Sequence, residues 1–385
     1  MDAGHSRRPP AMTMLSTEHE AVLREAVSCG ASDILITAGH PVMVLVAGTL
    51  RSMPGRATLS ADDARRIAEA FLTPELAERF TRELELDTRI SLAGVGNFRV
   101  NLFMQRGQWG AAIRVVPLHI PMPAEIGLQR DVVSRILEFR RGLVLITGPT
   151  GAGKSTTIAS LLEQVNQGEV RRHIVTVEDP IEFVFEAKNG VFDQREVPTD
   201  TRSYARGLRG ALRQLPHIIF VGEMRDLESV AIALTAAETG NLVISTMATQ
   251  SAAQTVTRII DSFPPHQQAQ IRAQVALSLR AVVAQVLFPR ADGKGRVAAR
   301  EIMFVNQAIQ NLIREEKVHQ ITNVISTSPR ENMVTLEDSL MELVEQGVVA
   351  GEMASPYIDD PEKRALLRRG KPKAAPLREA VAGSV

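Results

Sequence analysis

The sequence predicts an α/β protein in which a small α+β domain precedes a larger domain built on a mostly parallel sheet. After Arg141, continuous apolar runs alternate with helical stretches, which is the pattern of parallel strands buried on both faces. Shorter strand-like runs, bounded by turn residues, fill the first part of the chain. Pro117, Pro121 and Pro123 separate these two patterns, because closely spaced prolines continue neither a strand nor a helix.

The composition is that of a globular protein with two or three full-sized domains. The chain has 385 residues, of which 44% are hydrophobic and 23% are charged, so its body is not intrinsically disordered. Because 44 Lys and Arg balance 44 Asp and Glu, zero net charge argues against binding nucleic acid or an acidic membrane through bulk electrostatics. The single cysteine, Cys29, excludes an intrachain disulfide and a multi-cysteine zinc site. With no membrane-spanning apolar run and no signal peptide in Met1–Pro10, we expect a soluble protein of the cytosol.

Residues 1–15 are polar and aperiodic and are expected to be flexible, and residues 16–116 form the first predicted domain. Its helices are expected where apolar residues recur at helical spacing behind Ser or Thr caps, at Ser16–Ser28, Ser60–Phe71 and Pro74–Arg82. Its strands are expected at Asp33–Thr37, Val42–Val46, Thr88–Leu92, Asn97–Phe103 and Gly110–Val115. Residues 117–128, which hold the prolines, form the predicted linker.

Residues 129–353 form the second predicted domain. After a helix at Asp131–Glu138, its buried strands are expected at Gly142–Thr147, His173–Val177, Ile218–Val221 and Leu242–Ser245. Beyond them we expect helices at Pro264–Leu287 and Gln307–Glu316, and a hairpin within Val286–Glu301 that turns on Asp292–Gly295. Residues 354–385 are small and basic and are expected to form a disordered tail.

The strongest motif is Gly148-Pro-Thr-Gly-Ala-Gly-Lys-Ser155, which matches GxxxxGK[ST] between a buried strand and the apolar helix Thr156–Val165. Its glycines let successive backbone N–H groups point at phosphates, and the helix adds its positive end. Lys154 is expected to reach the β- and γ-phosphates, and the Ser155 hydroxyl to bind Mg²⁺. The alternative is a glycine-rich turn that happens to hold a lysine. We predict nucleoside triphosphate binding by Gly148, Pro149, Thr150, Gly151, Ala152, Gly153, Lys154, Ser155 and Thr156.

Carboxylates follow two of the predicted strands. Ile218–Val221 leads into Glu223, the first candidate for polarising the attacking water. Glu178 and Glu182 follow another strand, and the carboxyl ends of parallel strands meet at the same crevice. Two alternatives stay open, namely a solvated carboxylate at a strand end for Glu223 and an ordinary polar turn for the second cluster.

Two arginines, Arg99 and Arg114, lie on predicted strands of the first domain. An arginine reaching a nucleotide from another domain or subunit could stabilise the charge of a transition state. The alternative, a surface arginine on an edge strand, is equally compatible with the residues alone.

Four segments together resemble the secretion and type IV pilus ATPase superfamily, and more narrowly its pilus retraction (PilT-like) ATPases. These segments are Gly148–Ser155, Glu178–Phe183, Val221–Asp226 and Leu234–Gly240. In addition, Ala308–Glu315 is close to the AIRNLIRE signature of the retraction motors. Assembly and type II secretion relatives commonly carry a four-cysteine insert, which a single cysteine excludes here.

The resemblance implies a PAS-like N-terminal domain, a RecA-like P-loop ATPase domain and a homo-hexameric ring with ATP and Mg²⁺ between the domains. It matches Glu182 and Glu223 to the family's catalytic acids, and Arg99 and Arg114 to arginines that reach the phosphates. Glu178 is the third catalytic candidate. The implied activity is ATP hydrolysis coupled to pilus retraction and twitching motility. The implied partners are an inner-membrane platform protein and a sister retraction ATPase, in the cytoplasm at the membrane base of the pilus.

The chain also departs from the family pattern. The His box, usually GHLVFGTLHT, reads Gly240–Thr249 here, with Asn241 and Ala248 at its two histidine positions. An acidic stretch expected before Ile218 is replaced by Gln214–His217. Since alanine donates no side-chain hydrogen bond, we expect nucleotide binding with slow or weakly coupled hydrolysis. The alternative function is an accessory nucleotide-binding paralogue that modulates the main retraction motor.

Overall fold

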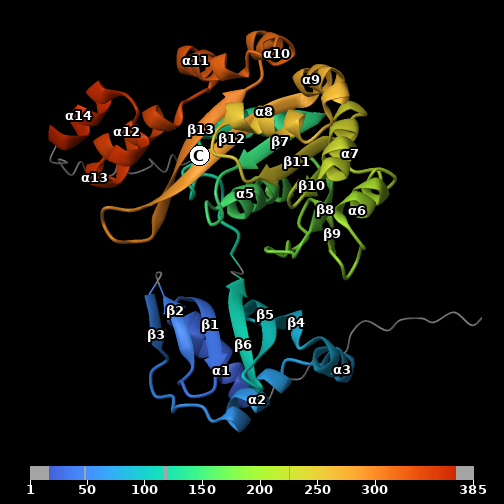
Figure 1. The fold of residues 1–385 in the computed structure, drawn as a ribbon, viewed down its shortest axis with the longest axis vertical. Helices are drawn as coiled ribbons and strands as arrows, with labels where there is room; N and C mark the ends of the chain where they lie inside the picture. Colours follow the sequence, from blue (N-terminus) through green and yellow to red (C-terminus); the bar gives the residue numbers. More distant parts are fainter. Residues whose placement is uncertain (1–16, 47–48, 117–118, 225, 370–385) are drawn as a thin grey trace, which may run out of the picture. The chain divides into compact units, whose positions relative to one another are not determined.

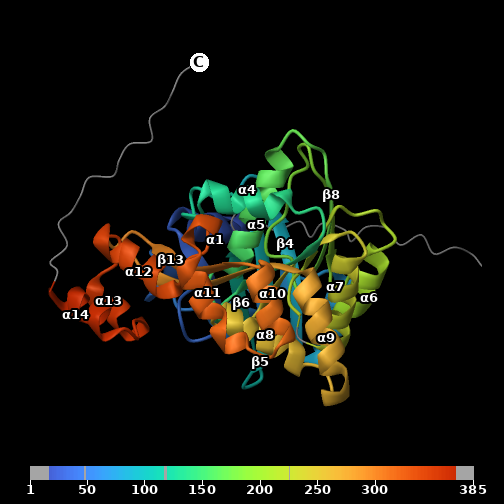
Figure 2. The same cartoon turned by 90° about the horizontal axis from the view of Figure 1, so that it is seen from above.

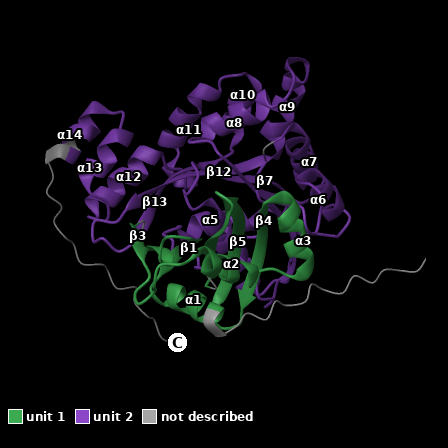
Figure 3. Cartoon of the chain, turned by 60° about the horizontal axis from the view of Figure 1, so that its bottom comes forward, with its two compact units in different colours: residues 1–119 green, residues 120–385 purple. Residues whose placement is uncertain are grey.

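A computed structural model describes residues 17–46, 49–116, 119–224 and 226–369. The chain divides into two compact units, residues 1–119 and 120–385 (Figure 3). Their boundary falls inside the segment 117–128 for which a linker is predicted. The expected flexible residues 1–15 lie outside the described residues.

Unit 1 contains three helices and six strands within its described residues. They are α1 (Thr17–Ser28), β1 (Ala31–Thr37), β2 (Met43–Val46), β3 (Thr49–Ser52), α2 (Ala61–Glu69), α3 (Pro74–Glu83), β4 (Glu85–Leu92), β5 (Gly96–Gln105) and β6 (Gln108–Val116). The expected helices and five expected strands are confirmed, and the side chains of Ser60 and Thr73 cap α2 and α3. Strand β3 was missed because all four of its residues are exposed, so it carries no apolar alternation.

The antiparallel sheet of unit 1 has the order β3-β2-β1-β6-β5-β4. Along β5 the side chains alternate, so that Phe98, Val100 and Leu102 are buried while Asn97 and Arg99 lie on the other face. The helices pack on the apolar face, where Phe71 and Phe80 complete the core. This leaves a polar sheet face that carries Arg99.

The described residues of unit 2 are built around a seven-stranded sheet with the order β13-β12-β7-β11-β10-β8-β9 (Figure 1). Its strands are β7 (Gly142–Thr147), β8 (His173–Glu178), β9 (Val191–Glu196), β10 (Ile218–Val221), β11 (Leu242–Met247), β12 (Leu279–Pro289) and β13 (Arg296–Phe304). Its α-helices are α4 (Arg130–Glu138), α5 (Lys154–Gln167), α6 (Tyr204–Ala211), α7 (Leu227–Glu238), α8 (Ala252–Asp261), α9 (Pro265–Ser278), α10 (Gln307–Arg314), α11 (Ile321–Thr327), α12 (Leu336–Glu345), α13 (Gly351–Ala354) and α14 (Pro361–Arg369).

All neighbouring strands of this sheet run parallel except β12 and β13, which form an antiparallel hairpin. Helices α4 and α5 cover one face, and α6 to α9 cover the other (Figure 2). The strands β7, β10 and β11 are completely buried, as continuous apolar runs predict. The predicted α/β fold class with a mostly parallel sheet is therefore confirmed. Within the described residues, no helix has the length and apolar character needed to cross a membrane.

The predicted helix Pro264–Leu287 was wrong beyond Ser278, where α9 ends and β12 begins. The run from Leu279 is mostly apolar, with Arg280 and Gln285 as its polar residues, so its pattern does not distinguish a buried helix from a buried strand. The segment forms a strand because β12 pairs with β7 on one side and with β13 on the other. Strand β9 was missed as well, because its residues mix exposed and partly buried positions at the edge of the sheet.

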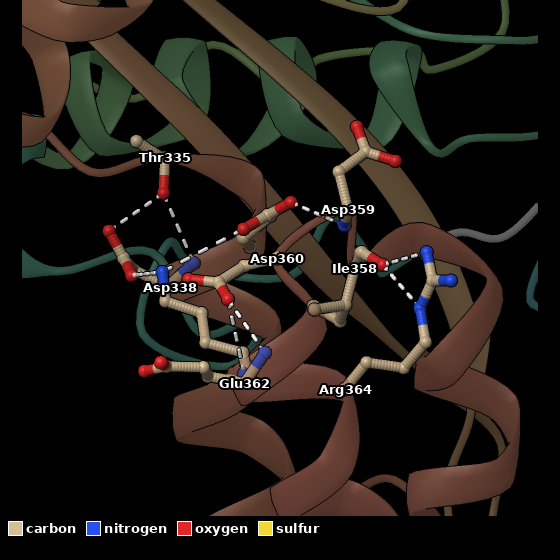
Figure 4. Close-up of polar contacts among 9 residues, drawn as sticks. Thr335, Asp338, Ile358, Asp359, Asp360, Glu362 and Arg364 are labelled. Atoms are coloured by element: carbon tan, nitrogen blue, oxygen red, sulfur yellow. Dashed lines mark hydrogen bonds and ion pairs between the residues drawn. The ribbon is translucent and has the colours of Figure 1, made fainter.

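The prediction of disorder from residue 354 was wrong as far as Arg369, because the chain forms α13 and α14 there. Leu367 of α14 is buried against Phe288 and Leu340. Polar contacts add to this packing: Lys363 Nζ lies 2.7 Å from an oxygen of Asp338, and Arg364 Nε donates to the Ile358 carbonyl at 2.8 Å (Figure 4). Residues 370–385 lie outside the described residues.

We expect Leu367→Ala to release α14, because deleting a buried leucine side chain costs about 2–5 kcal/mol. Trypsin should then cleave after Lys363 and Arg364 about tenfold faster or more. Cleavage after Lys294, in the exposed turn between β12 and β13, serves as the internal control. Equal cleavage rates at Lys363 in the variant and the original chain would show that α14 is not held by its buried face.

Candidate active site

The phosphate loop connects the end of β7 to the start of α5, as the motif predicts. Gly153 precedes the helix in the left-handed region, with a φ of 82°. Gly148 has a φ of 143°, and a Cβ at this position would lie 2.3 Å from the backbone oxygen of Gln285 on β12. The loop therefore needs glycine at position 148 both for its backbone conformation and for its close approach to β12.

Lys154 occupies the first position of α5 and reaches back over the loop. Its Nζ donates hydrogen bonds to the carbonyl oxygens of Gly148 at 2.8 Å and Pro149 at 3.0 Å. Burial lowers the pKa of Lys154, while the negative charges of Glu223 and Glu182 raise it. Two of the three predicted catalytic carboxylates, Glu223 and Glu182, therefore lie close enough to act electrostatically on this lysine.

Glu223 is positioned by backbone hydrogen bonds of the sheet. The N–H of Gly222 donates to the Val177 carbonyl at 2.8 Å, and the N–H of Met224 donates to the Thr246 carbonyl at 3.2 Å. The Glu223 side chain between these two anchors is half-buried. Glu223 is thus fixed at the carboxyl end of β10, at the same edge of the sheet as the start of the phosphate loop.

Glu182 lies on the segment after β8 and is exposed. Residues of β9 hold this segment: the N–H of Ile181 donates to Glu196 at 3.0 Å, and the N–H of Phe185 donates to Gln194 at 3.0 Å. The edge strand that the sequence failed to indicate is therefore what presents Glu182.

Glu178 differs from the other two carboxylates because it is buried. Its Oε1 accepts hydrogen bonds from Thr176 Oγ1 at 2.7 Å and from Gln194 Nε2 at 3.4 Å. Burial raises the pKa of Glu178 to about 7, with a further contribution from the charge of Glu182. In a substantial fraction of the molecules Glu178 is therefore neutral at neutral pH. This favours a supporting role for Glu178 in the site.

The residues of the loop fit the phosphates of a nucleotide with its Mg²⁺. The first N–H groups of α5 have no partner within the helix and attract anions, and Lys154 supplies a positive charge beside them. Ser155 and Thr156 follow in the first turn, where the Ser155 hydroxyl is an oxygen donor of the kind that Mg²⁺ prefers. The described residues form no cluster of three or more His, Cys, Asp or Glu suited to a metal, so phosphate oxygens would complete the shell.

Arg99 and Arg114 lie in unit 1, directly opposite each other on β5 and β6. The next position on β4 is Arg89, and the next on β1 is Asp33, which accepts a hydrogen bond from Arg114 Nε at 2.9 Å. Three arginines thus form one row across the polar sheet face. Arg89 was missed as a candidate, although its place on a predicted strand could have indicated it.

The two altered His-box positions lie at opposite ends of β11. Asn241 precedes the strand, and its carbonyl accepts a hydrogen bond from the N–H of Gly142 at the start of β7. Ala248 follows the strand, just after Met247, whose carbonyl accepts from the N–H of Gly148 at 3.3 Å. Six strand residues separate them, or about 20 Å, so Ala248 alone lies at the phosphate end.

Gln285 of β12 is a second residue that the sequence did not indicate. Its side chain is 1% exposed, its Nε2 donates to the Ala152 carbonyl at 2.6 Å, and its Oε1 accepts from Thr157 Oγ1 at 2.9 Å. The polar residue within an apolar run was the available signal, but the run was assigned to a helix.

Comparison with known proteins agrees with this geometry. The sequence model of a family described as type II/IV secretion system protein matches residues 14–355. The chain belongs to this family. Within it, the chain is 43% identical over 333 residues to the type IV pilus retractation ATPase PilT of Pseudomonas aeruginosa, covering 86% of this chain and 96% of that protein. It is 35% identical over 351 residues to the type IV pilus ATPase PilU of the same organism, covering 91% of both chains.

A solved structure of the family has the same fold. The crystal structure of the pilus retraction motor PilT with bound ADP superposes with a TM-score of 0.81 at 41% identity, covering 89% of this chain and 97% of that one. The resemblance to the retraction ATPases inferred from the four segments is thereby confirmed.

We expect Glu178→Gln to stabilise the protein, and increasingly so at higher pH. The pKa of Glu178 is raised in the folded state, so its ionisation opposes folding, and the stability gained on protonation is lost as pH rises toward and past 7. The gain from the substitution should grow by about 1 kcal/mol from about pH 6 to about pH 8.5. Thermal unfolding across this range measures it, and melting curves of both proteins that shift in parallel with pH would contradict it.

Proposed function

We propose that this protein hydrolyses ATP and, as a homo-hexameric motor, drives the retraction of type IV pili. The single observation that carries the proposal is the placement of Lys154 on the phosphate loop within electrostatic reach of Glu223 and Glu182. The names of the relatives support the same role, since they are a pilus retraction ATPase and a twitching motility protein.

In the proposed reaction, the loop and the start of α5 bind the phosphates of ATP while Lys154 balances their charge. Glu223 orients a water molecule for attack on the γ-phosphorus and accepts its proton. The new phosphorus–oxygen bond forms as the bond to the β-phosphate oxygen breaks, which yields ADP and phosphate. Mg²⁺, when bound at Ser155, supplies charge neutralisation for the phosphate oxygens.

Coupling to work follows from the two-unit organisation in this proposal. The arginine row of unit 1, with Arg99 and Arg114, supplies positive charge to a nucleotide bound at unit 2. Loss of phosphate would change the angle between units joined by residues 117–128, and a closed ring would convert such shifts into motion of a partner. We propose an inner-membrane platform protein as that partner, with the ring in the cytoplasm at the pilus base.

Replacing Glu223 by Gln tests the hydrolytic role. The substitution keeps the shape of the side chain but removes the base, so kcat should fall by about 10²–10⁴-fold while the dissociation constant for MgADP stays within about threefold. Phosphate release and calorimetric titration measure the two quantities. Glu228→Gln, on the exposed start of α7, is the matched control and should retain full activity. Equal kcat in the Glu223→Gln variant would exclude this residue as the base.

A second candidate function is an accessory paralogue that binds nucleotide, hydrolyses it slowly and modulates a sister retraction ATPase. The observation that favours it is Ala248, an exposed residue that replaces a hydrogen-bonding histidine at the phosphate end of β11. The 35% identity to PilU, a second pilus ATPase of an organism that also has PilT, is in keeping with this candidate.

The two His-box positions offer a matched pair of variants. Ala248→His should raise kcat by about tenfold or more if the missing donor limits turnover, because it restores a hydrogen-bond donor beside the phosphates. Asn241→His, at the far end of β11, should leave kcat unchanged. Steady-state phosphate release measures both, and an Ala248→His variant no faster than the original chain would remove this argument for the accessory function.

A further inference from the structure

Two buried polar residues face each other in the mostly apolar hairpin of β12 and β13. Gln285 and Arg300 are direct partners in the antiparallel register, and they are 1% and 5% exposed. The N–H of Arg300 turns away from β12 and donates to Ser339 Oγ of α12 at 3.0 Å. The pair is therefore of the non-hydrogen-bonded kind, in which the two side chains stand close together on the same face of the sheet.

One member of the pair holds the phosphate loop. The Gln285 amide bridges the Ala152 carbonyl, within the loop, and the Thr157 hydroxyl, in the first turns of α5. These two partners fix the orientation of the amide, since only Nε2 can donate to a carbonyl. The Gln285 backbone also limits position 148 to glycine, so β12 contacts the loop at its first residue and again near its end, at Ala152.

The other member, Arg300, holds the first segment of unit 2. The guanidinium of Arg300 donates to the carbonyls of Ile126 at 2.8 Å and Gly127 at 3.1 Å. In the part of the chain that the structure describes, Arg300 Nε is buried without a hydrogen-bond partner. Burial lowers the pKa of Arg300 to about 10. A buried cation with carbonyl partners is costly, and an apolar side chain would fill the same space without that cost.

We propose that Gln285 is a positioning residue for the phosphate loop, and that the Gln285–Arg300 pair couples this loop to residues 120–128. The proposal rests on the nucleotide binding put forward above. Phosphates seated in the loop displace the Ala152 carbonyl and the start of α5, and Gln285 follows both. Because the hairpin is tightly packed and paired along its length, the displacement reaches Arg300 and the carbonyls at 126 and 127.

Hydrogen exchange of residues 120–128 in the full-length protein measures this coupling. The N–H groups of Glu125, Gly127 and Leu128 donate to backbone carbonyls within this segment, so they exchange at measurable rates. The exchange is followed without nucleotide and with saturating MgADP. At saturation, a weaker affinity for MgADP is not mistaken for a lost response of the segment.

The variants are Gln285→Leu, Arg300→Met and, as the matched control, Glu301→Leu. Glu301 is the neighbouring buried residue of β13, and its carboxylate accepts from the N–H of Ala252 at the start of α8 rather than contacting the loop or the segment 120–128. All three variants remove a buried polar group from the same hairpin, and thermal unfolding shows whether they lower stability to a similar degree.

We expect MgADP to change the exchange rates of residues 120–128 several-fold in the original chain and in Glu301→Leu. Gln285→Leu should bind MgADP about tenfold more weakly or worse, and its segment should not respond even at saturation. Arg300→Met should keep its affinity within about threefold but exchange faster and without response to nucleotide.

The proposal is overturned if the original chain binds MgADP without any change in residues 120–128. It is also overturned if Gln285→Leu keeps the full response, or if Glu301→Leu loses the response as completely as the other two variants. A failure of the original chain to bind MgADP at all is a different result, since it contradicts the proposed function itself.

Discussion

The close packing of β12 against the phosphate loop is the constraint on which the site depends. The backbone of Gln285 leaves room only for hydrogen at position 148, and the side chain of Gln285 fastens the loop at Ala152. The conformation of the loop therefore depends on β12, a strand that lies more than a hundred positions later in the sequence. The loop, held in this conformation, presents the positive charge of Lys154 together with the N-terminal end of α5.

The parallel sheet supplies the other half of the chemistry, because it brings the ends of β8 and β10 to the edge where the loop begins. The three carboxylates at this edge differ in their surroundings, and this sets what each can do. Glu178 is buried with a raised pKa, Glu223 is half-buried and Glu182 is exposed. A base with access to water is expected at Glu223 or Glu182, and a neutral hydrogen-bonding group at Glu178.

Much of this arrangement could be predicted from the sequence, because the signals for it are local. The strands β7 and β10 are each a continuous apolar run next to a motif, and the loop after β7 is itself the motif, so the limits of both strands were predicted correctly. What could not be predicted depends on pairing in space. The mostly apolar run at β12 is compatible with a helix or a strand, so only its position between β7 and β13 makes it a strand and gives Gln285 its role. In the same way, only strand register joins Arg89 to the arginine row.

The most direct test of this account is calorimetric titration of MgADP into the Gly148→Ala variant of the full-length chain. The variant should not bind at nucleotide concentrations that saturate the original chain, because the added Cβ would lie 2.3 Å from the Gln285 oxygen and force the loop away from β12. Circular dichroism should show that the variant remains folded. Binding of MgADP by the folded variant with the affinity of the original chain would contradict the account.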